Sequence, residues 1–146
     1  MNNEDILNII ELLDLNKKKL EKKNIIISGA FGFIGKYFLE TLYNLRNDFQ
    51  IDFKIYAIDN FITSNESSID YFSNKKIYCI NHDITNTLDI DVEFDYLICL
   101  AGIASPYYYN KYPIETLNVS INGLNNMFKL KHNKNSKFIF FSSSEI

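Results

Sequence analysis

The stretch Asn24-Ile-Ile-Ile-Ser-Gly-Ala-Phe-Gly-Phe-Ile-Gly-Lys36 decides the fold, because it joins a short apolar strand to a Gly-x-x-Gly-x-x-Gly turn. Gly29 lets the backbone turn out of the strand, Gly32 lets a diphosphate approach the main chain, and Gly35 lets the next helix pack close. That helix begins near Phe33, so its unpaired N–H groups and positive dipole end face the same point. The residues expected around a bound dinucleotide here are Gly29, Phe31, Gly32, Phe33, Ile34 and Gly35.

The context of this turn supports a dinucleotide site, which three glycines alone would not. Residues 25–27 are β-branched and apolar, as in a strand buried on both faces. A second apolar strand, residues 53–58, ends in Asp59, twenty-four residues after Gly35, near where a carboxylate accepts hydrogen bonds from the adenosine ribose. The alternative is a glycine-rich turn with an incidental acid. Strand, helix and acid together favour the dinucleotide.

The residues at the end of the second strand also distinguish between cofactors. Asp59 is followed by Asn60, with no Arg nearby. Because a carboxylate repels a 2′-phosphate, the pattern favours NAD over NADP.

Composition is that of a globular protein of one domain: 146 residues, 47% hydrophobic, 23% charged, with a formal net charge of −3. The lysines are scattered or paired with acids, which argues against a nucleic-acid partner. The apolar runs have strand length, and the first fifteen residues carry four acids, so we expect no transmembrane helix, no ordinary signal peptide and a cytoplasmic location. Cys79 and Cys99 are predicted to be buried thiols, and two Cys with two His lack metal-ligand spacing.

The chain divides into an amphipathic helical extension, residues 1–22, and a dinucleotide domain, residues 23–146. In the extension we expect one helix over 4–22 that packs outside the nucleotide fold or supports a partner contact. Strands are predicted at 24–28, 53–58, 76–80, 95–100 and 137–141, with helices at 33–46, near 66–73 and from Pro113. The last helix has an apolar stripe of Ile114, Leu117, Ile121, Leu124 and Phe128.

This alternation predicts an α/β fold: a Rossmann-type, doubly wound parallel sheet in the strand order 3-2-1-4-5, truncated after strand five.

Ligands bind at the carboxyl ends of such strands. Three more segments lie there. Asp83 and Ile84 follow strand three, where the Asp can accept from the adenine amino group or merely start a turn. Small residues follow strand four, namely Leu100, Ala101 and Gly102. Residues 142–145, Ser-Ser-Ser-Glu, follow strand five, where hydroxyls and a carboxylate suit sugar binding and proton transfer, or form a Ser-rich loop.

Taken together, these segments resemble the extended short-chain dehydrogenase/reductase family, over residues 24–146. Within that family the chain is most similar to the UDP-glucuronate decarboxylases. The more specific part of the resemblance is a substrate loop after strand four together with the Ser-Glu pair after strand five. The residues of the substrate loop are Ala104, Ser105, Pro106, Tyr109, Tyr112 and Pro113.

The resemblance implies a reaction and roles for two residues. In these decarboxylases NAD⁺ oxidises the sugar at C4, the β-keto acid loses CO₂, and NADH reduces the product to UDP-xylose. Ser143 would bind and polarise the C4 oxygen, and Glu145 would act near C5. A 4,6-dehydratase would carry Asp where this chain has Ser144, and a 4-epimerase would usually lack the acid at Glu145. Those two enzymes, and a non-catalytic NAD-binding module, remain the alternatives.

Two departures from the family pattern affect these expectations. Ser120 stands where relatives usually have Asn, and the catalytic Tyr-x-x-x-Lys pair expected after strand five is not present. Tyr107 and Lys111 match that spacing, but they precede strand five. We therefore expect the 146-residue chain to be inactive by itself, the nucleotide-sugar domain to be missing, and the complete enzyme to be a homodimer.

Overall fold

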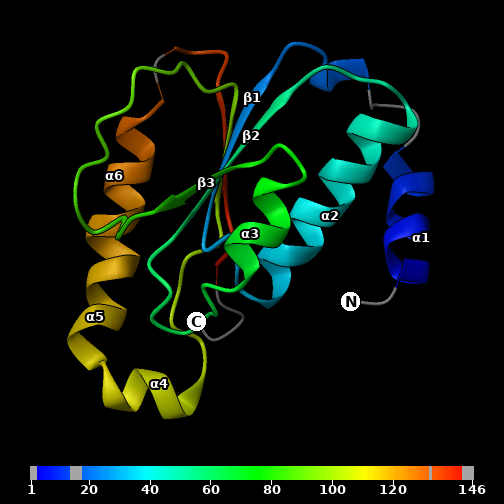
Figure 1. Ribbon diagram of the computed structural model, residues 1–146. Coiled ribbons are helices and arrows are strands. Elements are labelled where there is room, and N and C mark those ends of the chain that lie inside the picture. The colour runs from blue at the N-terminus through cyan, green and yellow to red at the C-terminus, as the bar shows by residue number, and fades with distance from the viewer. Residues whose placement is uncertain (1–2, 14–17, 132, 143–146) are drawn as a thin grey trace.

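The computed structural model describes residues 3–13, 18–131 and 133–142, and shows one parallel sheet between two layers of helices (Figure 1). The sheet has the order β3-β2-β1-β4-β5, as predicted. Its register places Ile26 of the central strand between Tyr56 and Leu97. The strands are β1 (Asn24–Ser28), β2 (Lys54–Asp59), β3 (Tyr78–Asn81), β4 (Tyr96–Cys99) and β5 (Lys137–Phe140).

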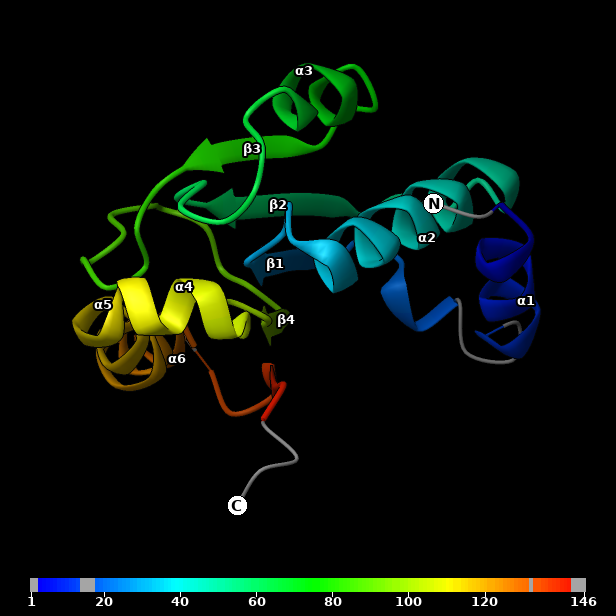
Figure 2. The ribbon, with the colours of Figure 1, turned by 90° about the horizontal axis from the view of Figure 1, so that it is seen from below.

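Helices cover both faces of the sheet, so the fold is doubly wound (Figure 2). The helices are α1 (Asn3–Leu13), α2 (Phe33–Asp48), α3 (Ser68–Ser73), α4 (Pro106–Lys111), α5 (Pro113–Asn118), the π-turn η2 (Val119–Gly123) and α6 (Leu124–Lys129). Helices α1 to α3 lie on one side of the sheet, and α5 and α6 lie on the other.

Alternation along β1 produces one hydrophobic core on each face. Ile25 and Ile27 join the cluster formed with α1, α2 and α3, whereas Ile26 joins the cluster of Leu97, Met127 and Leu130 beneath α6. All three isoleucines of β1 are at most 1% exposed. A strand buried on both faces has to be apolar at every position, which is why this run is unbroken.

The extension is helical over a shorter range than the predicted 4–22. Helix α1 ends at Leu13, residues 18–20 form a single 3₁₀ turn, and residues 14–17 lie outside the described part of the chain. Ile6 and Ile10 are buried in the core formed with α2 and α3, whereas the apolar residues Leu7 and Leu13 of the same helix are exposed. The lysines that follow cannot extend a buried face, so the helical periodicity does not continue into them.

Two further expectations need correction. Residues 106–111, expected as a loop, form α4, because Pro106 occupies the first turn after an extended Ser105.

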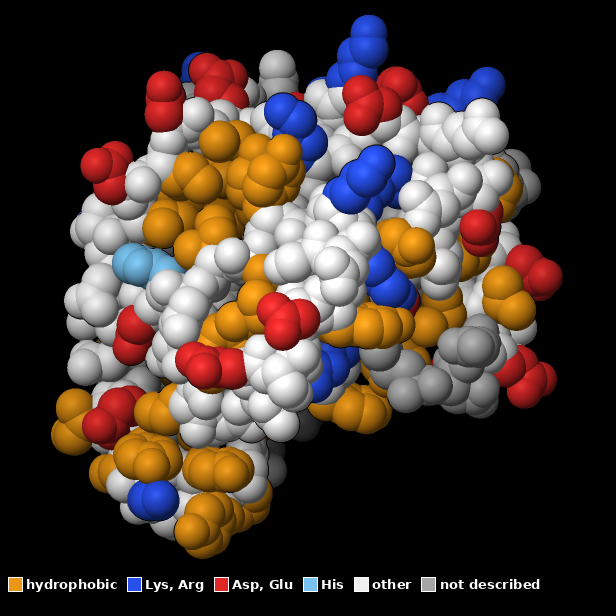
Figure 3. Space-filling view, in the orientation of Figure 1, with side chains coloured by type: hydrophobic (Ala, Val, Ile, Leu, Met, Phe, Trp, Pro, Cys, Tyr) orange, Lys and Arg blue, Asp and Glu red, His pale blue; other side chains and the backbone are white. Residues whose placement is uncertain are grey.

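The helix from Pro113 is interrupted by η2 and does not bury its apolar stripe: Ile114, Leu117, Ile121 and Phe128 are exposed. It contacts the sheet through the neighbouring face, where Gly123 and Met127 are buried. Figure 3 shows hydrophobic side chains gathered over α4 and α5.

The last strand, β5, lies at the edge of the sheet and is exposed. Ile139, Phe140 and Phe141 are each more than two-fifths exposed. Cys99 is a buried free thiol and Cys79 a half-buried one. In the described part of the chain no helix is long and apolar enough to cross a membrane.

Candidate functional site

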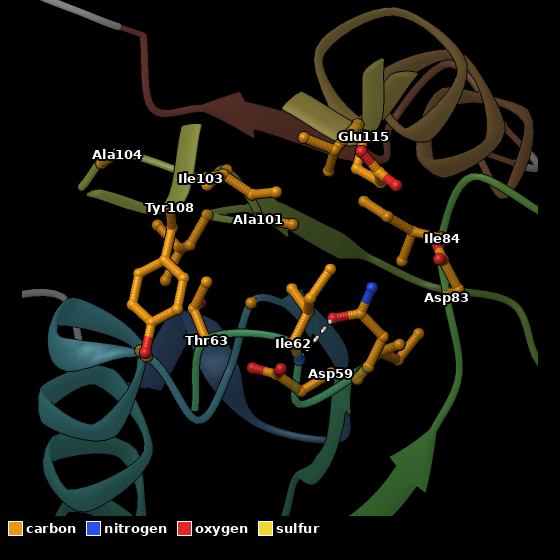
Figure 4. A pocket seen from close by; sticks show the side chains of 18 of the residues that line it. Asp59, Ile62, Thr63, Asp83, Ile84, Ala101, Ile103, Ala104, Tyr108 and Glu115 are labelled. Atoms are coloured by element: carbon orange, nitrogen blue, oxygen red, sulfur yellow. Dashed lines mark hydrogen bonds between the residues drawn. The ribbon is translucent and has the colours of Figure 1, made fainter. Parts of the chain in front are cut away.

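A pocket of about 460 Å³ opens at the carboxyl ends of the strands, between the α2 side and the α5 side of the sheet (Figure 4). It brings together segments from the ends of β1, β2, β3 and β4, which are far apart in sequence. The predicted site residues that line it are Gly29, Gly32, Phe33, Ile34, Gly35, Asp59, Asn60, Asp83, Ile84, Leu100, Ala101, Gly102, Ala104 and Ser105.

The glycine turn owes its shape to close backbone contacts. Gly29 has φ of +67°, and a Cβ there would lie 2.6 Å from the backbone nitrogen of Ala101. A Cβ on Gly35 would lie 2.5 Å from the carbonyl oxygens of Gly29 and Ala30, so the helix can approach the strand only with glycine there. These two contacts confirm the sharp turn and the close helix packing that the sequence predicts.

The start of α2 points a row of backbone donors at the pocket. Gly32 is the extended N-cap residue and makes no side-chain cap, and Lys36 donates the first helical hydrogen bond to its carbonyl, at 3.1 Å. The N–H groups of the first turn therefore have no partner within the helix. A helix of sixteen residues adds the positive end of its dipole at the same point. This end of the pocket suits an anion such as a diphosphate.

Asp59, at the end of β2, connects the glycine turn to the next loop. One carboxylate oxygen accepts from the N–H of Phe31 at 2.9 Å, and the other accepts from Phe61 N–H and the Ser64 hydroxyl, each at 2.9 Å. The side chain of Phe31 does not line the pocket; it is buried and stacks on Phe61 at 5.2 Å between ring centroids. Asp59 thus lines the pocket in a fixed orientation, with acceptor capacity left, since a carboxylate offers about four lone pairs.

Asn60 and Asp83 join the ends of β2 and β3. The Asp83 carboxylate accepts from Thr85 N–H at 2.9 Å. Burial opposes its ionisation, but hydrogen bonds from Thr85 and Asn60 outweigh burial and hold the pKa of Asp83 below its ordinary value. Asn60 in turn accepts from Ile62 N–H at 3.2 Å, drawn in Figure 4. Asp83 is therefore held in its charged form by its own loop and by Asn60, and it keeps acceptor capacity.

After β4, only part of the expected substrate loop lines the pocket. Ala104 and Ser105 line the pocket, whereas Pro106 and Tyr109 of α4 do not. Tyr108 takes the place expected of Tyr109, and its ring faces the pocket from the side opposite Ile84. On a helix only one of three consecutive tyrosines can face a given direction, and that direction depends on the unforeseen helix α4.

Sequence reasoning missed a group of residues that close the pocket from the α5 side. They are Glu115, Asn118, Val119 and Phe141, together with Ile62 and Thr63 from the loop after β2. No local signal marks the α5 residues, since their place depends on how the helix packs over the sheet. The expected catalytic residues Ser143 and Glu145 lie outside the described residues, so their roles stay predictions.

The parallel sheet, the glycine turn opening α2 and the pocket above them define a Rossmann-type α/β domain. Comparison with known proteins then gives the family. Residues 25–146 match the sequence pattern of the NAD dependent epimerase/dehydratase family, and the chain belongs to that family.

Relatives of this chain include UDP-glucuronic acid decarboxylases. UDP-glucuronic acid decarboxylase 1 of Arabidopsis thaliana is 30% identical over 90% of this chain and 28% of its own length. UDP-glucuronic acid decarboxylase 1 of Danio rerio is 29% identical over 86% of this chain and 28% of its own. The chain thus spans little more than a quarter of the length of these relatives.

Solved structures agree on the fold. A UDP-N-acetylglucosamine 4-epimerase from Methanobrevibacter ruminantium M1 superposes with a TM-score of 0.63 at 26% identity, over 86% of this chain and 39% of that one. A UDP-glucose 4-epimerase from Bifidobacterium longum, with NAD⁺ and UDP bound, gives 0.60 at 19% identity, over 83% and 37%. The chain corresponds to the N-terminal part of such enzymes, whose sheet order it shares.

Proposed function

We propose that this chain supplies the NAD-binding part of a nucleotide-sugar enzyme whose reaction is the decarboxylation of UDP-glucuronate to UDP-xylose. The NAD-binding part of this proposal rests on one observation, that the glycine turn, Asp59 and the Asp83 loop line the same pocket. The reaction half rests on the decarboxylase relatives, at about 30% identity, and on the Ser-Glu motif of residues 142–145.

Two glycines in the pocket wall would leave room for the diphosphate and the riboses of the cofactor. A Cβ on Gly102 would meet nothing within 4 Å, and one on Gly32 would meet only the Gly29 carbonyl oxygen, at 3.3 Å. Both glycines line the pocket, so ligand atoms can occupy the volume that other residues would fill. The first-turn N–H groups of α2 would hold the diphosphate oxygens.

Charge around Asp59 supports NAD over NADP. Its carboxylate would accept from the hydroxyls of the adenosine ribose and repel a phosphate at the 2′ position. Among the described residues that line the pocket there is no Lys or Arg to bind such a phosphate. The wall formed by Leu100, Ala101 and Gly102 would carry the cofactor toward the end of β4 and the nicotinamide side.

The chemistry proposed for the bound cofactor is hydride exchange with C4 of the sugar. Ser143 would hold the C4 oxygen, and Glu145 would act near C5 as the carboxylate leaves. Tyr108 and Ser105, which line the pocket on the β4 side, would contact the sugar nucleotide.

Calorimetry tests the cofactor half. We expect NAD to bind at least about tenfold more tightly than NADP, because one charge repulsion at close range exceeds about 1.4 kcal/mol. Asp59→Asn should shrink that ratio, since the amide loses the charge but keeps an acceptor. Asp89→Asn removes an exposed carboxylate outside the pocket and should leave the ratio unchanged. Equal affinity for both dinucleotides in the unmodified chain would contradict the assignment.

A product assay tests the reaction half. The complete coding product is incubated with NAD⁺ and UDP-glucuronate, and UDP-xylose and CO₂ are the expected products. The 146-residue chain alone should form neither. UDP-xylose made by this chain in isolation would show that the Tyr-x-x-x-Lys pair is not required. Binding of NAD with no turnover of any sugar nucleotide by the complete product would favour a non-catalytic module.

A 4-epimerase is the second candidate, favoured by the 26% identity with the Methanobrevibacter enzyme. UDP-glucose and UDP-N-acetylglucosamine belong in the same assay. Conversion of either to its C4 epimer, without CO₂ release from UDP-glucuronate, would replace the decarboxylase assignment.

A further inference from the structure

We propose that Asn126 of α6 is a positioning residue for the base of the dinucleotide, because its side-chain amide holds the turn after β3 that carries Asp83. This inference rests on the proposed NAD-binding function and extends it to a residue that does not itself line the pocket. Asn126 lies 41 and 42 residues along the chain from the two residues whose carbonyls it binds.

The base end of the pocket follows from the order of the strands. The diphosphate belongs at the glycine turn after β1 and the ribose hydroxyls at Asp59 after β2, so the base extends toward the end of β3. There the Asp83 carboxylate can accept a hydrogen bond from an exocyclic amino group, and Ile84 offers an apolar surface to the ring. Both residues line the pocket, and Figure 4 shows them together across from Tyr108.

The turn that carries Asp83 follows the edge strand of the sheet. β3 has four residues and pairs with β2 on one side. Within the turn, Asn86 N–H donates to the Asp83 carbonyl and Thr85 N–H to the Asp83 carboxylate, each at 2.9 Å. These bonds fix the shape of the turn, and Asn60 joins the carboxylate to the loop after β2. The place of the turn over the pocket then depends on a contact from the helix layer.

Helix α6 supplies that contact. Asn126 Nδ2 donates to the Ile84 carbonyl at 3.0 Å and to the Thr85 carbonyl at 2.9 Å, so one amide group binds both central residues of the turn. Lys129 donates to Asn126 Oδ1 at 3.4 Å, which leaves the amide nitrogen facing the turn. Three residues before Asn126, a Cβ on Gly123 would lie 2.9 Å from Ile84 Cδ1, so the helix and the turn are in close contact.

The helix can hold the turn because it is anchored in the core. Met127 and Leu130 are 1% and 9% exposed and belong to the cluster around Leu97 of β4. Asn126 therefore connects the end of an edge strand to the buried interior. Because a polar contact weakens when its partners move by about 1 Å, loss of this connection should reach the base through Asp83.

The test compares NAD with nicotinamide hypoxanthine dinucleotide by calorimetry on the whole chain, because hypoxanthine has a carbonyl oxygen where adenine has its amino group. The unmodified protein should prefer NAD by about tenfold, the range of one hydrogen bond to a charged group. In Asn126→Ala the preference should fall by about threefold or more, because Asp83 is no longer held in place. Partial unfolding would not change this ratio, since it lowers both affinities by the same factor.

Three variants separate the donor role of Asn126 from other effects. Asn126→Asp keeps the size of the side chain but removes the donor, and it should reduce the preference at least as much as Asn126→Ala. Asn125→Ala is the matched control, because Asn125 is the exposed neighbour on the same helix, and it should retain the full preference. Asp83→Asn should remove most of the preference, because its amide can face either base with a matching group. Adding Asn126→Ala to Asp83→Asn should then cause no further loss.

The outcomes distinguish this inference from the proposed function. A preference that survives Asn126→Ala but falls in Asp83→Asn would make Asn126 a structural residue only and overturn the proposal. Independent, additive losses in the double variant would overturn it as well. Equal binding of the two dinucleotides by the unmodified chain would overturn this inference and leave the NAD-binding function in place. If neither dinucleotide binds, the proposed function fails along with it.

Discussion

The two walls of the pocket are built differently. The wall formed by β1, β2 and the start of α2 comes from one continuous segment, residues 24–59, and its strands are enclosed: Ile26 and Ile55 are fully buried. The opposite wall, formed by β5 and the helices from α4 to α6, leaves Leu117 and Phe140 exposed by 60% and 46%. The first wall therefore stabilises the fold by burial, whereas the second offers apolar area that a contact with further protein would bury.

The largest effect should come from the enclosed wall. Gly29→Ala puts a Cβ on a left-handed residue, 2.6 Å from a backbone nitrogen, and should lower the free energy of unfolding by about 3 kcal/mol or more. Gly102→Ala is the matched control, because its Cβ meets nothing within 4 Å, and should stay within about 0.5 kcal/mol. Urea denaturation measures both. Similar losses in the two variants would mean that the close approach at Gly29 is not a constraint.

A pair of truncations on neighbouring strands compares the buried interior of the sheet with its exposed edge. Leu97 of β4 is fully buried, and Leu97→Ala should cost about 3 kcal/mol through lost contacts and a residual cavity. Ile139 of β5 is 42% exposed, and Ile139→Ala should cost less than about 1 kcal/mol. Urea unfolding again provides the measurement. An equal cost would show that β5 is covered in solution, as in an assembly.

We expect the chain to self-associate through the exposed wall. We expect the apparent mass of the chain to rise with concentration in sedimentation equilibrium, because β5 presents an open apolar edge beside an apolar helix face. Leu117→Glu should weaken this association at little cost in stability. Ser120→Glu adds the same charge at an exposed polar position of η2 and should weaken it less. A monomer at every concentration would contradict the expectation.

The smallest effect concerns the N-terminal ends of the strands, away from both walls. Burial raises the pKa of Asp95, but hydrogen bonds from Lys23, at 2.8 Å, and from Asn24 N–H, at 2.9 Å, prevail and lower it. The stability this provides is present above the ordinary aspartate pKa of about 3.9 and is lost as the pH falls through the lower folded value.

Urea unfolding as a function of pH checks that sign. Between about pH 5 and pH 2 the unmodified chain should lose stability more steeply than Asp95→Asn, which has no carboxylate to protonate. Asp89→Asn serves as the reference for an exposed acid. Parallel slopes for the unmodified chain and Asp95→Asn would exclude a contribution from this group.

Sequence predicts the enclosed wall well because its determinants are local. The glycine spacing, the unbroken β-branched run and the acid at the end of a strand each have a short-range cause, and the sheet order follows from their alternation. That Asn60 and Ile84 line the pocket follows from the rule that ligands bind at the carboxyl ends of parallel strands. What sequence does not reveal is that Asp59 already accepts three hydrogen bonds from its own protein.

The open wall is less predictable because its geometry depends on tertiary packing. Three consecutive tyrosines suggest no helix, although Ser105-Pro106 is a helix-start signal that would have found α4. The apolar stripe from Ile114 predicts a buried face, yet the helix packs through Gly123, where a Cβ would lie 2.9 Å from Ile84 Cδ1. Once the helix sits there, Glu115 enters the pocket, a position that no pattern along the chain indicates.

The π-turn η2 has a consequence for how this helix tolerates changes in length. A π-turn accommodates one extra residue without altering the phase of the helix on either side. Deleting the exposed Ile121 should therefore let η2 relax to an α-turn and leave both Glu115 and Met127 facing as before. Deleting a residue within α6 would instead rotate one flank by about 100° relative to the other. A length change that disrupts most helices would be nearly silent at this one site.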